Sequence, residues 1–147
     1  MFLKDKFVKA HMRSAEVYAS LSSARRLQVG CVIVKNDTII GIGYNGMPSG
    51  WDNKCEDDVY VDDFHVELIT KPEVIHAEAN ALAKVTKSTN SSEDAFLFCT
   101  HAPCLDCAKQ IYQAGIKAVY YRHTYKTEVG LDFLRKCQIH IKKVEHV

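Results

Sequence analysis

The order of apolar segments is the feature that most limits the folds open to this chain. Two β-branched runs flank Asn36 and Asp37, a pair that favours a tight hairpin turn. Three segments with helical spacing then alternate with three strand-like runs. A hairpin followed by helix–strand repeats predicts an α/β fold, a three-layer α/β/α sandwich with a mixed five-stranded sheet. The expected strands are 29–35, 38–44, 95–100, 117–122 and 138–144, and the expected helices are 74–87, 103–114 and 128–137.

Two further segments complete the expected domain, which at 147 residues is predicted to be a single unit over 1–147. Residues 2–22 have the spacing of an amphipathic helix, with an apolar face expected at Phe7, Ala10, Val17 and Leu21. Residues 46–71 are rich in acids and are predicted to form a long irregular loop, held to the domain by Trp51 and Phe64. Loops of that length in a compact domain are usually functional.

Composition excludes several classes of protein. Hydrophobic residues make up 47% and charged residues 25% of the chain, which is the balance of a globular protein and excludes disorder, collagen and coiled coil. A net charge of +1 argues against a nucleic acid partner and leaves a small anionic ligand open. The charged N-terminus is unlike a signal peptide, and no apolar run approaches the ~18 residues of a membrane span. We therefore predict a cytoplasmic protein with no membrane partner.

In that compartment, the six cysteines are expected to be metal ligands or buried thiols rather than disulfides. Cys31, Cys99 and Cys137 stand in apolar runs and are predicted to be buried thiols. Cys55 and His65, ten positions apart in the acidic loop, leave a second, structural zinc site open.

Two short motifs carry the residues suited to chemistry, and each stands at the start of a predicted helix. His76 and Glu78 belong to the first motif, and Cys104 and Cys107 to the second. Cysteines three positions apart lie on one face of a helical turn, so both thiolates can bind one ion. A helix N-terminus favours negative charge and thereby lowers the pKa of a thiol. The motifs therefore predict a metal site, provided that the two helix starts converge.

One histidine and two cysteines make three zinc ligands, as in catalytic sites whose fourth position belongs to water. Zinc lowers the pKa of that water, and Glu78 can take and return the proton. Histidine-x-glutamate followed by Pro103 and the two cysteines is the signature of zinc-dependent nucleobase deaminases. A redox cysteine pair or half of a structural zinc site is the alternative, and it leaves Glu78 without a role.

The chain resembles the zinc-dependent cytidine/deoxycytidylate deaminase superfamily over about residues 28–144, and its deoxycytidylate (dCMP) deaminases in particular. Besides the metal motifs, the resemblance rests on Gly-Tyr-Asn-Gly-Met-Pro at 43–48, His-Ala-Glu-Ala-Asn-Ala at 76–81 and Gln-Ala-Gly-Ile-Lys at 113–117. Deaminases of free nucleosides use cysteine as the first ligand. Deaminases of tRNA adenosine share the metal motifs, but the run at 43–48 fits the dCMP family better.

The resemblance implies hydrolysis of dCMP to dUMP and ammonia, a reaction that supplies thymidylate synthesis. It implies Zn²⁺ as the catalytic cofactor, held by His76, Cys104 and Cys107. Zinc-bound hydroxide is then expected to attack C4 of the cytosine, while Glu78 protonates N3 and afterwards the departing amine.

Five residues are predicted to bind the substrate. Asn45 follows a strand end and, by resemblance, contacts the deoxyribose or the base; the alternative is an asparagine that satisfies a turn. Ala77 and Pro103 lie inside the metal motifs, beside helix-start N–H groups placed to meet the ring carbonyl. Arg26 is the candidate for the 5′-phosphate, with a solvated position as the alternative. Tyr125 lies in a loop that, in related deaminases, shapes substrate choice.

The resemblance also implies regulation. It links Gly43, Tyr44, Asn45 and Gly46 to an allosteric nucleotide site near a subunit contact, where dCTP activates and dTTP inhibits, each with Mg²⁺, in a homohexamer. Two other functions stay open: a deaminase acting on a base in tRNA or single-stranded DNA, and a catalytically silent zinc-binding subunit. The first must bind flanking phosphates, which the near-neutral charge disfavours.

Overall fold

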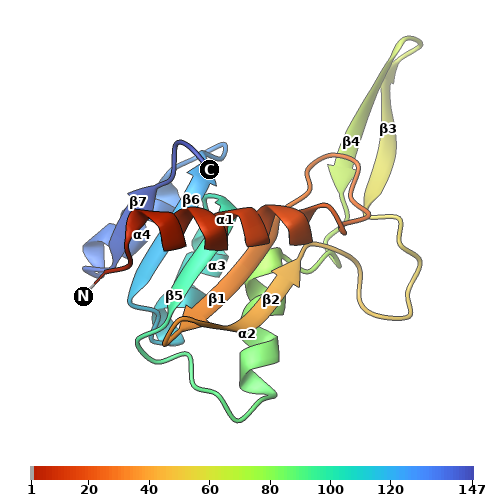
Figure 1. Cartoon of the computed structure of the whole chain (residues 1–147). Coiled ribbons are helices and arrows are strands. Elements are labelled where there is room, and N and C mark those ends of the chain that lie inside the picture. The colour runs from red at the N-terminus through yellow and green to blue at the C-terminus, as the bar shows by residue number, and fades with distance from the viewer. Residues whose placement is uncertain (1) are drawn as a thin grey trace.

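A computed structural model describes residues 2–147 and contains a five-stranded sheet (Figure 1). Its strands are β1 (Gly30–Lys35), β2 (Thr38–Tyr44), β5 (Phe96–His101), β6 (Ala118–His123) and β7 (His140–Lys143). They lie in the order β2-β1-β5-β6-β7. β1 is antiparallel to β2 and β5, whereas β5, β6 and β7 run parallel to one another. The sheet is therefore mixed, as predicted.

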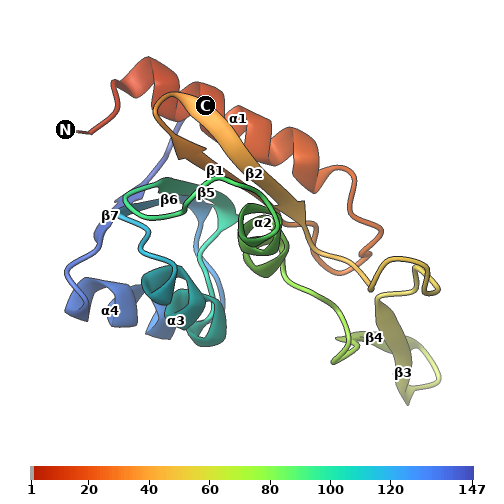
Figure 2. The same cartoon turned by 90° about the horizontal axis from the view of Figure 1, so that it is seen from below.

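Helices cover both faces of the sheet (Figure 2). On one face lies α1 (Asp5–Ala19), and on the other lie α2 (Ala77–Thr86), α3 (Leu105–Gln113) and α4 (Val129–Lys136). One apolar cluster, with Phe98 and Tyr120, fills the space under α1, and a second, with Ile33 and Leu97, lies under the other three helices. The predicted three-layer α/β/α sandwich is confirmed. Within residues 2–147, no helix has the length and apolar character needed to cross a membrane.

The turn between β1 and β2 has the conformation that its sequence predicts. Asn36 and Asp37 have φ angles of 50° and 59°, in the left-handed region that asparagine and aspartate tolerate better than most residues. Two consecutive positive φ angles are what a two-residue type I′ hairpin needs. The antiparallel pairing closes beside the turn at Lys35 and Thr38.

Helix α1 buries a different face from the predicted one. Phe7, Val17 and Leu21 are exposed, and the residues that face the sheet are small or slender: Val8, Met12, Ala15 and Ala19. The reason is the close approach of α1 to β1, because a Cβ added at Gly30 would overlap the Ala15 carbonyl oxygen. Only a face with small side chains can come that near, so the fit to the sheet overrode side-chain size.

The acidic segment 46–71 is only partly irregular. β3 (Glu56–Asp62) and β4 (His65–Thr70) form a separate antiparallel hairpin, here called the arm, which projects from the body of the molecule (Figure 1). The prediction of an irregular loop is wrong for these residues. Trp51 and Phe64 are 55% and 92% exposed, so they do not hold the segment to the domain as predicted. Both strands are exposed along nearly their whole length, so no buried apolar face marks them in the sequence.

Candidate active site

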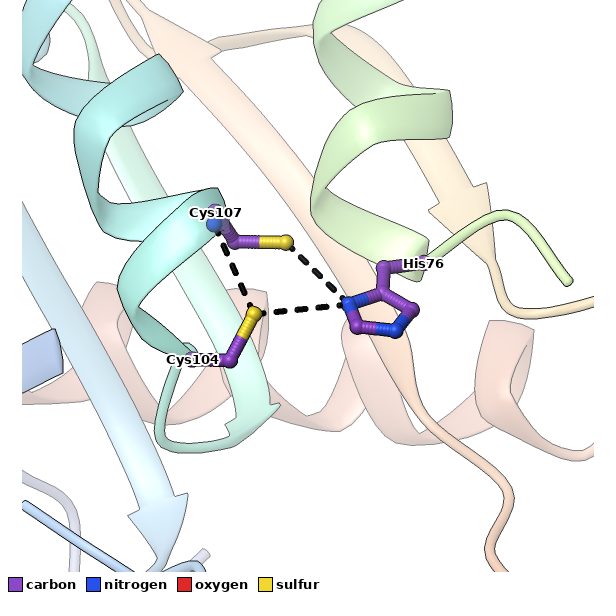
Figure 3. A group of neighbouring side chains, drawn as sticks. All are labelled: His76, Cys104 and Cys107. Atoms are coloured by element: carbon purple, nitrogen blue, oxygen red, sulfur yellow. Dashed lines mark hydrogen bonds between the residues drawn. The ribbon is translucent and has the colours of Figure 1, made fainter. Parts of the chain in front are cut away.

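The sheet brings the starts of two helices together. His76 is the N-cap residue of α2 and Cys104 is the N-cap residue of α3, with Cys107 in the first turn of α3. Figure 3 shows the three side chains pointing toward one another from these two helix ends. Residues 28 positions apart in the sequence thus become neighbours, which meets the condition that the motifs alone left open.

The distances among these side chains suit a zinc ion. His76 Nδ1 lies 3.3 Å from Cys107 Sγ and 3.6 Å from Cys104 Sγ. Tetrahedral zinc, with bonds of about 2.3 Å to sulfur and about 2.0 Å to nitrogen, places such atoms about 3.5 Å apart. Among residues 2–147, no other group of three histidine, cysteine or acidic side chains is gathered in this way. His76, Cys104 and Cys107 therefore form a possible metal site whose donors fit zinc.

Of the three side chains of the possible metal site, Cys104 is held in the ionised form in which cysteine binds zinc. Hydrogen bonds from the Cys107 thiol and from His76 lower the pKa of Cys104 to about 4. The Cys107 backbone N–H also donates to Cys104 Sγ, at 3.5 Å. The bond to Cys104 in turn raises the pKa of His76. Cys104 is thus a thiolate near neutral pH, the form in which cysteine binds zinc.

Glu78 lies in the first turn of α2 and is 4% exposed. Burial raises the pKa of its carboxyl, because the ionised form loses water without full replacement. Its side chain is not part of the three-residue metal group. Glu78 therefore lies buried beside the metal group, and proton transfer by its carboxyl stays a prediction.

A cavity of about 140 Å³ opens beside these residues. His76, Glu78 and Cys104 line it, and so do four of the predicted substrate-binding residues, Arg26, Asn45, Ala77 and Tyr125. The fifth, Pro103, is not in its lining. Pro103 is buried under α4, where a Cβ added at Gly130 would overlap its carbonyl oxygen.

The sequence of residues 5–123 matches the family model for the cytidine and deoxycytidylate deaminase zinc-binding region. The chain belongs to this family. Its residues in that region include the three possible metal ligands and Glu78. The family relationship makes the chain an enzyme of the zinc-dependent deaminase class.

Individual relatives extend along most of the chain. ComE operon protein 2 of Bacillus subtilis is 33% identical over 135 residues, 91% of this chain and 69% of that protein. The deoxycytidylate deaminase of Enterobacteria phage T4 is 35% identical over an alignment of 153 positions, which covers 80% of this chain and 79% of that one. The dCMP deaminase of cyanophage S-TIM5, in a crystal structure with dCMP and dUMP, superposes with a TM-score of 0.87 at 41% identity. That match covers 97% of this chain and all of that one.

Asn45, which the deaminase resemblance links to substrate, also holds the backbone beside the cavity. Its Nδ2 donates to the Leu27 carbonyl oxygen and its Oδ1 accepts the Val29 N–H, both at 2.8 Å. These bonds match the alternative interpretation, an asparagine that satisfies local backbone. An amide has four hydrogen-bonding positions, so one N–H and one lone pair remain for a ligand. A substrate contact by Asn45 therefore stays a prediction.

A second cavity, of about 510 Å³, lies beside the Gly-Tyr-Asn-Gly run. Tyr44, Asn45 and Gly46 line it, together with Asn80 and Lys84 of α2. Gly43 does not line it, and packing explains that glycine. A Cβ at Gly43 would overlap the Ala77 carbonyl oxygen, so strand β2 can approach α2 only without a side chain there.

The remaining cysteines play no part in the metal group. Cys31 and Cys99 are fully buried partners on neighbouring strands, as predicted, whereas Cys137 is only half-buried. Cys55 is buried beside Ser23, and His65 pairs with Asp62 in the arm. Cys55 and His65 do not gather with a third ligand within residues 2–147, so they form no second metal group there.

Sequence reasoning missed Glu56, a buried acidic residue of the cavity wall. Glu56 lines the cavity, is 1% exposed and belongs to β3 of the arm. In the sequence it is the first of three consecutive acids, and such a run is usually solvated. No local pattern distinguishes the buried member of the run from Asp57 and Asp58. His101, the last residue of β5, also lines the cavity, in agreement with its predicted place at a strand end beside the site.

Proposed function

We propose that this chain is a zinc-dependent dCMP deaminase that converts dCMP and water to dUMP and ammonia. The observation that carries the proposal is the His76, Cys104 and Cys107 group with the buried carboxyl of Glu78 beside it. The likeness to the cyanophage dCMP deaminase, which extends over nearly the whole chain, supports dCMP as the substrate. The near-neutral net charge supports a mononucleotide over a polynucleotide.

The residues divide the work of the reaction. His76, Cys104 and Cys107 would hold the zinc ion, and zinc when bound supplies the Lewis acidity that makes water a nucleophile near neutral pH. The Glu78 carboxylate accepts a proton from the attacking water and delivers it to N3 of the cytosine ring. It then carries a second proton to the amine that leaves from C4.

The direct test follows the ultraviolet change when purified, zinc-loaded protein is mixed with dCMP. Conversion of dCMP to dUMP supports the proposal. Absence of turnover on dCMP, with turnover on an oligonucleotide or a tRNA, would instead identify a polynucleotide deaminase. Absence of turnover on all of these, with zinc bound, would identify a silent zinc-binding subunit.

The 5′-phosphate is assigned to Arg26. Arg26 lines the cavity, whereas the Arg25 side chain is taken up by Asp58 on the arm, with 2.8 Å between Arg25 Nη2 and Asp58 Oδ1. Within residues 2–147, Arg26 has no ion-pair partner, so its guanidinium can pair with an incoming phosphate.

Arg26→Ala is expected to raise KM for dCMP about 10- to 100-fold, the loss of a hydrogen-bonded charge pair. Turnover of deoxycytidine, which has no phosphate, should stay at the wild-type level. Steady-state kinetics on both substrates measure the difference. Arg13→Ala, an exposed arginine of α1, is the matched control. An equal loss on both substrates would contradict the phosphate assignment.

The second cavity is the proposed regulatory site, where dCTP activates and dTTP inhibits, each carried with Mg²⁺. It adjoins the Gly-Tyr-Asn-Gly run, and Lys84 is the cation in its lining, suited to a phosphate. Mg²⁺ prefers to bind through phosphates and water, so it needs few protein ligands there. Cooperative control by such effectors requires several copies of the chain, and the homohexamer of the family supplies them.

Lys84→Ala is expected to raise, by about tenfold, the dCTP concentration that gives half-maximal activation. The reason is the loss of the one lysine that faces the cavity. The measurement is dCMP turnover against dCTP with Mg²⁺, with the oligomer followed by light scattering. Lys87→Ala, at the exposed end of α2, is the control. Turnover of the wild type that is indifferent to dCTP would remove the regulatory site and leave the catalytic proposal standing.

A further inference from the structure

The buried carboxylate of Glu56 is bonded in a way that neither the reaction nor the metal site explains. Glu56 Oε2 accepts the backbone N–H groups of Arg25 and Arg26, each at 2.9 Å. Its Oε1 lies 3.2 Å from the Arg25 N–H and 3.8 Å from Arg25 Nε. A buried carboxylate is costly unless its charge is compensated, and here two successive peptide N–H groups and one guanidinium compensate it.

These bonds fix the direction of a segment that regular structure does not hold. Residues 25–29 lie between α1 and β1, in neither helix nor strand. Glu56 holds this segment at Arg25 and Arg26, and Asn45 holds its other end at Leu27 and Val29. When consecutive N–H groups point at one oxygen, both peptide planes are set, and so is the side from which each side chain leaves the backbone.

As a consequence, the side chains of Arg25 and Arg26 lie in different surroundings. Arg25 is exposed and pairs with Asp58 on the arm, whereas Arg26 lines the cavity. Glu56 itself is unsuited to bind a phosphate, because two anions repel and its oxygens are already engaged. A favourable effect of Glu56 on a phosphate must therefore pass through another residue, and Arg26 is the cation of the cavity lining whose backbone Glu56 binds.

We infer that Glu56 is a positioning residue for the 5′-phosphate subsite, and that it ties the arm to the segment that carries Arg26. This inference rests on the proposed function, in which Arg26 pairs with the phosphate of dCMP. Glu56 acts on substrate binding and not on the proton transfers, since its hydrogen bonds go to the backbone of Arg25 and Arg26 and not to Glu78 or the metal group.

The test is a double-mutant cycle. Glu56→Ala is expected to raise KM for dCMP about tenfold, to keep kcat within about twofold and to leave deoxycytidine turnover nearly unchanged. In the Arg26→Ala background, the same substitution should change KM for dCMP by less than about twofold. The reason is that both substitutions act on the same contact, the one between the Arg26 side chain and the phosphate. Glu56→Gln should fall between the wild type and Glu56→Ala, since an amide oxygen can still accept both N–H groups but forms weaker hydrogen bonds than a carboxylate.

Asp58→Asn is the matched control, because it removes a carboxylate of the same strand that bonds to the Arg25 side chain and not to the backbone. It should leave KM for dCMP within about twofold of the wild type. Zinc content and melting temperature are measured for every variant. If Glu56→Ala does not fold, the glutamine variant decides, and a wild-type KM for dCMP in that variant overturns the inference.

Two other results would overturn the inference. One is an equal fall in kcat on dCMP and deoxycytidine for Glu56→Ala, which indicates a general structural role. The other is additivity of the Glu56 and Arg26 effects on KM. An Arg26→Ala variant with unchanged KM for dCMP would instead contradict the phosphate assignment itself, so the two failures are distinguishable.

Discussion

Glu78→Gln is expected to lower dCMP turnover by about 10⁴-fold while zinc stays bound. Glutamine keeps the shape and burial of the side chain but cannot accept a proton and give it back. General acid–base catalysis is worth up to about 10⁴-fold in rate, and here one carboxyl serves both proton transfers. The measurement is the steady-state rate on dCMP together with the zinc content of the same sample.

Glu73→Gln is the control for this substitution, because Glu73 is exposed on the segment that precedes α2. It should keep the wild-type rate. A Glu78→Gln variant that deaminates dCMP at a near wild-type rate would show that the proton is moved by another group. A variant that loses zinc as well would show that Glu78 supports the metal site rather than the chemistry.

Cys107→Ala is expected to remove zinc and turnover together. It leaves two ligands where a catalytic zinc site needs three, and it takes from Cys104 the hydrogen bond that most lowers the pKa of that thiol. Because a ligand that binds only the folded chain stabilises it, the variant should also melt at a lower temperature than the zinc-loaded wild type. The measurements are metal content by elemental analysis, melting temperature and rate.

The control for the metal site is Cys137→Ala, a cysteine outside the metal group. It should keep both zinc and activity. Chelation of the wild type should reproduce the loss of turnover, and added zinc should restore it, whereas Cys107→Ala should not be rescued. Full zinc content in Cys107→Ala would contradict the assignment of that ligand.

The residues of the possible metal site could be predicted because each lies in a short motif at a helix start. A cysteine pair at i and i+3, or a glutamate two residues after a histidine, has a local geometry that the helix alone defines. The hairpin turn at Asn36 and Asp37 is predictable for the same reason, since its conformation depends on two residues.

The buried face of α1 could not be predicted, because the sequence offers more than one apolar stripe. Phe7 and Val17 are larger than Ala15 and Ala19, and size alone favours their burial. The choice is made by β1, whose Gly30 lets the alanine face approach closely. A periodic pattern identifies a helix, but the surface that it meets decides which side is inside.

In the arm, likewise, the sequence does not predict which acidic residue is buried. Glu56, Asp57 and Asp58 are consecutive acids, yet only Glu56 is fully buried, because only its carboxylate meets the N–H groups of Arg25 and Arg26. Those partners lie about thirty positions earlier in the chain. Whether a charged residue is solvated or compensated depends on such distant partners, which no local pattern contains.

By itself, the sequence determined the helices and strands of the five-stranded sheet, the three-layer class of fold, and the candidate metal-binding and proton-transfer residues. Each of these can be recognised from a pattern among residues close together in the chain. The tertiary structure alone decided that the starts of α2 and α3 converge, that Arg26 and not Arg25 lines the cavity, and that Glu56 is buried. These features depend on the packing of segments far apart in the sequence. The hydrogen bonds and contacts that stabilise them form only once the sheet has brought those segments together.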